Sequence, residues 1–274
     1  LWLKNCQKKI LSNYFFLNIL NIFFFSIFYL KKKNVDRFFS TNIYCPIIKP
    51  KNMKITITLH HAMWLIFPGY YSIFKRIFFN SYYAFLNKNI SFIAISKHIK
   101  NKFKKKFGYY NIDVIYNPIL LKKKNKYNKK LIFENKNFFF YLAAKEKHKN
   151  IDTIIKAFQN KKIKNKFNLV IAGYKQQSEK ISNNIFLLGK IDEKLKSNLF
   201  DKCFCYIHPS IYEGFGMPLV EALKYKKKII TTYGGAIPEI TMKKAIYVKN
   251  PKNFNSWVDI IANFNSIKLY NIIF

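Results

Sequence analysis

The chain has 274 residues, half of them hydrophobic, which is enough for one large domain or two of moderate size around a packed core. Its formal charge of +36 comes from Lys rather than Arg and accompanies many Asn, Ile, Phe and Tyr residues. Codons rich in A and T encode all of these, and the lysines are scattered rather than gathered beside stacking aromatics, so we expect no nucleic-acid binding.

The first element is an aromatic, apolar run at residues 14–30, interrupted by Asn18 and Asn21 and flanked by lysines. It is short for a membrane span, which needs about 20 apolar residues. A signal peptide needs a start Met and small residues at a cleavage site, and neither is present. A buried or surface-seeking helix is therefore the plainer interpretation, and a membrane span is the alternative.

The rest of the first half has an α/β pattern. In chain order we expect a strand at 55–59, a long helix at 70–86, a strand at 92–95, a Lys-rich helix capped by Ser96 and ending near Phe107, and a strand at 114–115. A highly charged run at 121–136 has no core-facing set of side chains. We place the domain boundary within this run, which gives domains of residues 1–125 and 126–274.

The second half alternates short strands and helices. We expect strands at 138–143, 167–172, 185–188, 203–207, 228–232 and 245–248, and helices at 150–158, 192–200, 216–225 and 253–264. Strict alternation predicts a parallel sheet with both faces covered. In such a sheet ligands bind at the carboxyl ends of the strands, so candidate site residues are sought there.

The four cysteines, Cys6, Cys45, Cys203 and Cys205, have no CxxC spacing and no His at metal-ligand spacing. This pattern predicts no metal site. Buried free thiols fit a reducing compartment, so we expect a cytoplasmic protein.

The most informative stretch is His-Pro-Ser-Ile-Tyr-Glu-Gly-Phe-Gly-Met-Pro-Leu-Val-Glu-Ala at 208–222. Glu213 and Glu221 flank a Gly-Phe-Gly turn that leads into a helix with Pro218 in its first turn. Free N–H groups at such a turn suit a phosphate, and ionised carboxylates accept hydrogen bonds from hydroxyls. The arrangement is typical of a nucleotide-sugar site. The alternative is a solvated loop acid followed by a first-turn acid that stabilises the helix dipole.

Glu213-x7-Glu221 in this setting resembles the signature of glycosyltransferase family 4, retaining enzymes of the GT-B fold. Segments at 143–158, 169–173, 186–189 and 232–239 resemble further family segments in the expected order, and 59–62, 94–96 and 114–118 resemble acceptor-domain landmarks. Among family members, the chain is most similar to the mannosyltransferase-like ones that build surface polysaccharide. The resemblance implies an α/β fold of two Rossmann-like domains. The N-terminal acceptor-side domain (1–125) is expected to be truncated, and the C-terminal domain (126–274) to bind the nucleotide sugar.

The resemblance also implies individual roles. Glu213 would contact the donor sugar, Glu221 the nucleotide ribose, and Lys149 the leaving phosphate, so that no metal is required. His60 would lie near the sugar and the acceptor, while Gly173 and Lys190 would border the base. Backbone N–H groups from Gly216 to Leu219 would hold the diphosphate. The full donor-binding turn comprises Gly214, Phe215, Gly216, Met217, Pro218 and Leu219.

Two departures from the family pattern bear on these roles. The family pairs its Lys with an Arg, whereas this chain has Lys147-His148-Lys149-Asn150 and no Arg nearby. Lys145 or Lys147 would supply charge there, but without a bidentate fork. The second departure is His60-His61, where the family often has His-Asp.

We therefore expect a retaining transfer of a hexose from a nucleotide-diphosphate sugar to a glycan or lipid-linked acceptor, with no cofactor other than the donor itself. One alternative is an inactive remnant, suggested by the missing Arg and by the two ends of the chain, which both look cut. The other is a membrane-surface binding protein, suggested by the Lys excess and the run at 14–30. Both alternatives are compatible with the expected fold, and peripheral membrane contact is compatible with an active enzyme as well as with an inactive remnant.

Overall fold

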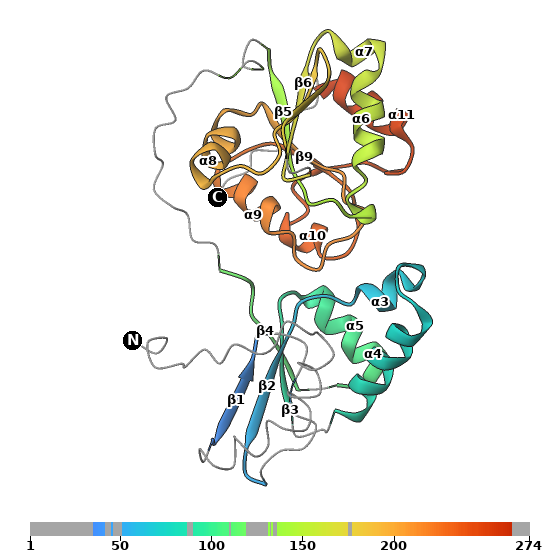
Figure 1. The fold of residues 1–274 in the computed structure, drawn as a ribbon, viewed down its shortest axis with the longest axis vertical. Helices are drawn as coiled ribbons and strands as arrows, with labels where there is room; N and C mark the ends of the chain where they lie inside the picture. The colour runs from blue at the N-terminus through green and yellow to red at the C-terminus, as the bar shows by residue number, and fades with distance from the viewer. Residues whose placement is uncertain are drawn as a thin grey trace. The chain divides into compact units, whose positions relative to one another are not determined.

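The computed structural model describes residues 35–41, 45, 51–86, 90–109, 111–118, 131, 133, 136–174 and 177–264 (Figure 1). The expectations for the run at 14–30 and for Cys6 lie outside these residues. Two compact units are present, one within residues up to 95 and from 99 to 115, the other made of 96–98 and the chain from 116 onward. No helix of the described residues combines the length and the apolar character needed to cross a bilayer.

The first unit is built on a parallel four-stranded sheet with the strand order β1-β2-β3-β4. Its strands are β1 (Arg37–Ser40), β2 (Lys54–Leu59), β3 (Ile90–Ala94) and β4 (Ile112–Val114), and its helices are α3 (Met63–Ile66), η3 (Pro68–Tyr70), α4 (Ile73–Phe85) and α5 (Lys97–Phe107). Helices α3, α4 and α5 gather on one side of the sheet (Figure 1). The short strand β1 has no clear apolar alternation and was not expected.

An aromatic cluster joins the three helices of this unit. Trp64 of α3 stacks on Tyr83 of α4 at a centroid distance of 5.3 Å, and Tyr83 meets Phe103 of α5 edge-on at 5.0 Å. Helix α4 begins three residues later than expected because the Ser72 side chain accepts a hydrogen bond from the N–H of Lys75 and caps the helix there.

The second unit contains a seven-stranded sheet with the order β11-β10-β9-β5-β6-β8-β7. The strands are β5 (Phe138–Leu142), β6 (Asn168–Ala172), β7 (Glu179–Ser182), β8 (Ile185–Leu187), β9 (Cys205–His208), β10 (Ile229–Thr231) and β11 (Ile246–Tyr247). The helices are η5 (Lys147–Lys149), α6 (Ile151–Gln159), α7 (Lys161–Lys164), α8 (Glu193–Lys202), α9 (Met217–Lys224), α10 (Ile237–Ile240) and α11 (Phe254–Ala262). Every expected element is present, with ends that differ from the expected ones by three residues or fewer.

Strand β5 shows why this sheet is covered on both faces. Phe139 packs edge-on against Phe158 of α6, while its neighbour Phe140 packs against Phe200 of α8. Successive side chains of a strand point to opposite faces, so α6 and α8 lie on opposite sides of the sheet, as Figure 1 also shows. The continuous aromatic run of β5 is therefore that of a central parallel strand.

The expectation of a purely parallel sheet is wrong at one edge. Strand β7 runs antiparallel to β8, connected by a tight turn at Asn183-Asn184. The sequence Glu-Lys-Ile-Ser of β7 is polar because the strand is largely exposed, so it carries no hydrophobic signal.

The thiol expectation is confirmed for the described cysteines, since Cys45, Cys203 and Cys205 are buried and free. The expectation that Cys203 belongs to the strand is wrong. The N–H of Cys203 donates to the carbonyl of Leu199 and closes α8, so β9 begins only at Cys205.

The strand order places a switch point between β5 and β9. From β5 the chain moves outward through β6 and β8, then returns to the other side of β5 with β9. The loops after β5 and β9 therefore diverge at the carboxyl edge of the sheet, where open α/β sheets bind ligands.

Candidate functional site

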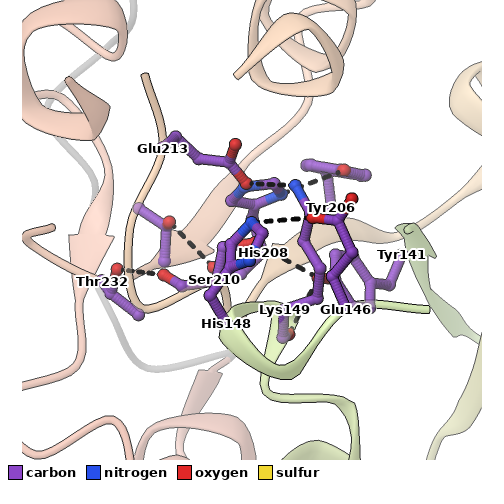
Figure 2. A network of polar contacts seen from close by, with 10 residues as sticks. Tyr141, Glu146, His148, Lys149, Tyr206, His208, Ser210, Glu213 and Thr232 are labelled. Atoms are coloured by element: carbon purple, nitrogen blue, oxygen red, sulfur yellow. Dashed lines mark hydrogen bonds and ion pairs between the residues drawn. The ribbon is translucent and has the colours of Figure 1, made fainter. Parts of the chain in front are cut away.

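A buried charge cluster occupies this switch point (Figure 2). Lys149 ends η5 after strand β5, His208 is the last residue of β9, and Glu213 lies in the loop that follows β9. The Lys149 Nζ lies 2.8 Å from Oε1 of Glu213, and His208 Nε2 lies 2.9 Å from the same oxygen. Both donors bind one carboxylate oxygen, so within the part of the chain that the structure describes Oε2 is left without a protein partner.

Backbone contacts from both strands hold Lys149 in place. Its carbonyl accepts a hydrogen bond of 2.9 Å from the hydroxyl of Tyr141 on β5. The preceding residue, His148, accepts through its carbonyl from the N–H of Ile211, at 2.8 Å, in the loop after β9. Asn150 then takes a left-handed conformation with φ of 54° and starts α6. These contacts with β5 and with the loop after β9 therefore aim Lys149 across the switch point.

The protonation states of the cluster follow from burial and hydrogen bonding. Burial lowers the pKa of His208 and favours the neutral ring. Its Nε2 faces the carboxylate of Glu213, which can only accept when ionised, so Nε2 carries the ring proton and donates it to Glu213. Nδ1, 3.3 Å from the hydroxyl of Tyr206, then accepts from that phenol.

Glu213 stays ionised in this environment. Burial alone would raise the pKa of its carboxyl, but the hydrogen bond from His208 and the charge of Lys149 outweigh burial and hold that pKa well below its usual range. The result is a buried carboxylate with one bound oxygen and one oxygen able to accept from a hydroxyl.

The turn after Glu213 has the backbone geometry of an anion-binding helix start. Gly216, with φ of 91°, is the N-cap of α9, and no side chain caps this helix. Pro218 has no N–H, and the N–H of Leu219 donates to the carbonyl of Gly216 at 2.9 Å. Of the expected diphosphate-binding turn, residues 214–217 are therefore the ones left to supply N–H groups to an anion.

Gly234 and Gly235 let the loop after β10 pack directly on the Glu213 loop. A Cβ on Gly234 would collide with the carbonyl oxygen of Ile211, and one on Gly235 with that of Glu213. The N–H of Ala236 donates to the Glu213 carbonyl at 2.9 Å. These glycines serve a close backbone approach that fixes the position of Glu213.

Glu221 forms a separate ion pair that the sequence did not reveal. Lys196 of α8 donates to Oε1 of Glu221 at 2.9 Å and also lies 3.0 Å from Oε1 of Glu193. Burial would lower the pKa of Lys196, but its two acidic partners raise it overall. The Glu193-x2-Lys196 spacing was visible, yet nothing in it pointed to a partner on another helix.

Gly173 and Lys190, which were expected to border the nucleotide base, also lie at the carboxyl edge of the sheet. The N–H of Gly173, after β6, donates to the carbonyl of Gly189, after β8, at 2.7 Å, and the exposed Lys190 follows directly. Gly173 has φ of 82°, and a Cβ there would lie 2.9 Å from the Ala143 carbonyl oxygen.

His60 lies in the first unit, directly after β2, with Nε2 at 2.7 Å from the carbonyl oxygen of Thr41. Among the described residues, no group of three or more His, Cys, Asp and Glu side chains is arranged to hold a metal ion. The structure thus joins Lys149 to Glu213 and Gly173 to the Gly189 turn.

Comparison with known proteins gives one family match. Residues 122–268, more than half of the chain, match the family model described as glycosyl transferases group 1. This range takes in all the site residues of the second unit described above.

Individual proteins agree with the family model. The chain is 29% identical over 251 residues to the O-antigen chain mannosyltransferase RfbU of Salmonella typhimurium, a match that covers 81% of this chain and 67% of RfbU. A solved glycosyltransferase from Rickettsia africae is similar at a TM-score of 0.63 and 19% identity, covering 95% of this chain and 75% of that protein. The HepE protein of Anabaena, solved in complex with UDP and glucose, is similar at a TM-score of 0.60 and 16% identity, covering 76% of this chain and 61% of that one.

Proposed function

Because the chain belongs to the group 1 glycosyl transferases and has the GT-B fold, we propose that it transfers a hexose from a nucleotide-diphosphate sugar to a glycan or lipid-linked acceptor, with retention of configuration and without a metal ion. Mannose is the sugar we favour, because RfbU is a mannosyltransferase of O-antigen chains. A nucleotide-sugar donor is further supported by HepE, which was solved with UDP and glucose.

The observation that carries the proposal is the Lys149–Glu213–His208 cluster at the switch point. A leaving diphosphate develops negative charge. In this proposal the ammonium group of Lys149 and the uncapped start of α9 stabilise that charge without a metal. Lys149 is already held at this place by its bond to Glu213, so little reorganisation accompanies the reaction.

Glu213 acts on the sugar in this proposal. Its Oε1 is bound by Lys149 and His208, which leaves Oε2 to accept a hydrogen bond from a sugar hydroxyl. The leaving phosphate itself takes part in deprotonating the acceptor hydroxyl, and the protein supplies positioning and charge stabilisation.

Glu221 binds the nucleotide in this proposal. Lys196 orients its carboxylate on α9, so that the carboxylate accepts hydrogen bonds from the ribose hydroxyls. Gly173 and Lys190 border the base, and His60 of the first unit acts near the sugar and the acceptor.

The test is an isothermal calorimetric titration of wild type and of Glu221→Ala with UDP and with GDP. Loss of hydrogen bonds to a charged acceptor amounts to about 1.5–3 kcal/mol, so Kd should rise roughly 10- to 100-fold. Glu193→Ala is the matched control, because Glu193 shares Lys196 with Glu221 but lies on α8. Unchanged affinity in Glu221→Ala would reject the ribose role.

A second measurement separates an enzyme from an inactive remnant. We expect purified wild-type chain to consume GDP-mannose or UDP-glucose in the presence of lipid-linked acceptors, and Glu213→Gln to lower kcat much more than it changes donor affinity. A chain that binds nucleotide and neither transfers nor hydrolyses any donor would be the remnant.

A further inference from the structure

Two tyrosines at the carboxyl edge of the seven-stranded sheet lie outside the charge cluster. Tyr233 follows β10 by two residues, and Tyr247 is the last residue of β11. Their rings meet edge to face, with a centroid distance of 4.9 Å and 66° between the ring planes. Tyr233 is 61% exposed, so at least one face of its ring is open to solvent. We call these two residues the edge tyrosine pair.

Tyr247 is the fixed member of the pair. Its hydroxyl lies 2.5 Å from Oγ1 of the fully buried Thr241. Thr241 donates its own proton to the carbonyl of Ile237 at 2.8 Å, so Tyr247 donates to Thr241. The ring of Tyr247 is therefore held in one orientation and supports the ring of Tyr233. A surface ring that is already held in place loses little conformational freedom when a ligand packs on it.

The chemistry of Tyr233 suits a sugar. Across the residues that the structure describes, its hydroxyl has no hydrogen-bond partner, and its ring contact is the one with Tyr247. The C–H groups on one face of a pyranose pack well on the negative face of an aromatic ring, and its hydroxyls can bond to a phenol. An open ring face with a free hydroxyl offers both contacts to the same sugar.

The strand order indicates which sugar would lie there. Gly173 and Lys190, expected at the base, follow β6 and β8, whereas Lys149 and Glu213, expected at the diphosphate and the transferred sugar, follow β5 and β9. Strands β10 and β11 continue this row on the side of β9 away from β5. Neighbouring strands lie about 4.8 Å apart, so the edge tyrosine pair is one to two strand spacings beyond the Glu213 loop. A ligand that extends in this direction past the transferred sugar is the acceptor.

The side chains after β10 point in the matching directions. Thr232 turns toward β9, where its Oγ1 donates to the carbonyl of Ser210 at 2.5 Å (Figure 2). Tyr233 turns the other way, onto Tyr247 of β11. The same loop is fixed to the donor side, because the N–H of Ala236 bonds to the carbonyl of Glu213. The loop therefore joins Tyr233 to the donor site but carries its ring outward from it.

We propose that Tyr233, supported by Tyr247, is a stacking platform for a sugar ring of a glycan acceptor, a ring other than the hexose that is transferred. The proposal rests on the proposed function, since it names where the acceptor of that transfer binds. Tyr233 is a binding residue here, and Tyr247 is a positioning residue that acts through it.

The experiment measures glycan and nucleotide binding separately in the full chain. Mannotriose and maltotriose are titrated by ligand-observed NMR, and UDP and GDP by calorimetry. Tyr233→Ala should raise the Kd of the trisaccharide that binds roughly tenfold and leave the Kd values of UDP and GDP unchanged. Tyr233→Phe keeps the ring and loses one hydrogen bond, so its Kd should rise only about two- to fivefold.

Phe85→Ala is the matched control for the loss of an exposed aromatic ring. Phe85 is 82% exposed and ends α4 just before β3 begins, which places it at the amino edge of the other sheet. This variant should bind the trisaccharides like wild type. The melting temperature of Tyr233→Ala should stay within about 2 °C of wild type, because the ring is largely exposed, so that lost binding is not unfolding.

The outcomes separate this platform from the proposed function. Binding of neither trisaccharide by wild type, or equal Kd values for wild type and Tyr233→Ala, would overturn the platform and leave the nucleotide result standing. Weaker UDP or GDP binding by Tyr233→Ala would place Tyr233 on the donor and overturn it as well. If wild type bound no nucleotide, the proposed function would fail, while the trisaccharide titrations would still decide the platform.

Discussion

Replacing Lys149 by Met removes one charge from the cluster and keeps the length of the side chain. The Lys149 and Glu213 side chains are only 17% and 10% exposed, so the pair lies largely outside solvent screening. Lys149→Met leaves the Glu213 carboxylate buried with a single donor, the Nε2–H of His208. The variant therefore tests whether the cluster is a coupled unit.

The expected loss of stability follows from this geometry. Removing one partner of a fully buried ion pair costs about 3–5 kcal/mol. Because His208 remains and Lys149 is partly exposed, we expect about 1–3 kcal/mol for Lys149→Met. Glu213→Gln should cost a similar amount, and the double variant should cost less than the sum, with a coupling energy of about 1–2 kcal/mol.

The assay is urea unfolding of the four proteins at pH 7. Lys145→Met is the matched control, because Lys145 is an exposed lysine in the same segment and its replacement should change stability by no more than about 0.5 kcal/mol. A Lys149→Met variant as stable as Lys145→Met, or a coupling energy near zero, would refute the reasoning.

The pH dependence gives an independent measure. The folded-state pKa of Glu213 lies below the ordinary value of 4.5, so the stability that it contributes is present above pH 4.5 and is lost as the pH falls through the folded-state pKa. Wild type should therefore lose more stability than Glu213→Gln on acidification below pH 4.5. Parallel curves for the two proteins would contradict the assignment of an ionised Glu213.

Three further outcomes follow from the structure. Lys196→Met should weaken UDP or GDP binding several-fold, because Glu221 is then no longer held by an ion pair, while Lys196→Arg should keep most of the affinity. Equal Kd values for wild type and both variants would show that Lys196 does not position Glu221. Gly235→Ala should destabilise the protein by about 2–4 kcal/mol in thermal or urea unfolding, because Gly235 has a φ of 68° and a Cβ there would collide with a carbonyl oxygen. Gly69→Ala is the control and should be close to neutral, because there is open space around Gly69. Burial raises the pKa of Cys205 well above its usual value, so its alkylation at pH 8, mapped by mass spectrometry, should be at least about tenfold slower in the native protein than in urea.

The local sequence pattern was sufficient to predict most helices and strands of the second unit. The aromatic run of β5 indicated a strand covered on both faces, and the structure shows helices packed on each side of it. The Gly-Phe-Gly turn followed by Pro218 indicated a helix start, and α9 begins at Met217. Such features are readable because the backbone preferences of Gly and Pro and the periodicity of side chains act over a few residues.

Elements without such a signal were missed. Strand β7 is polar because it is an exposed edge strand, and β1 is too short for its alternation to be visible. For α4 the helix was expected, but its apolar side chains surround much of the axis, so the sequence did not show which of them face solvent.

The partners within the site were decided by tertiary structure. The sequence named Glu213, Glu221 and Lys149 as candidates, because their residue types and the flanking glycines have a chemical meaning of their own. Glu213 and Lys149 are 64 residues apart, and Glu221 and Lys196 are 25 apart. Contacts over such separations depend on which strands are neighbours and on how helices pack on the sheet, which local pattern does not encode. The order β9-β5-β6 brings Lys149 to Glu213, and the packing of α8 beside α9 brings Lys196 to Glu221.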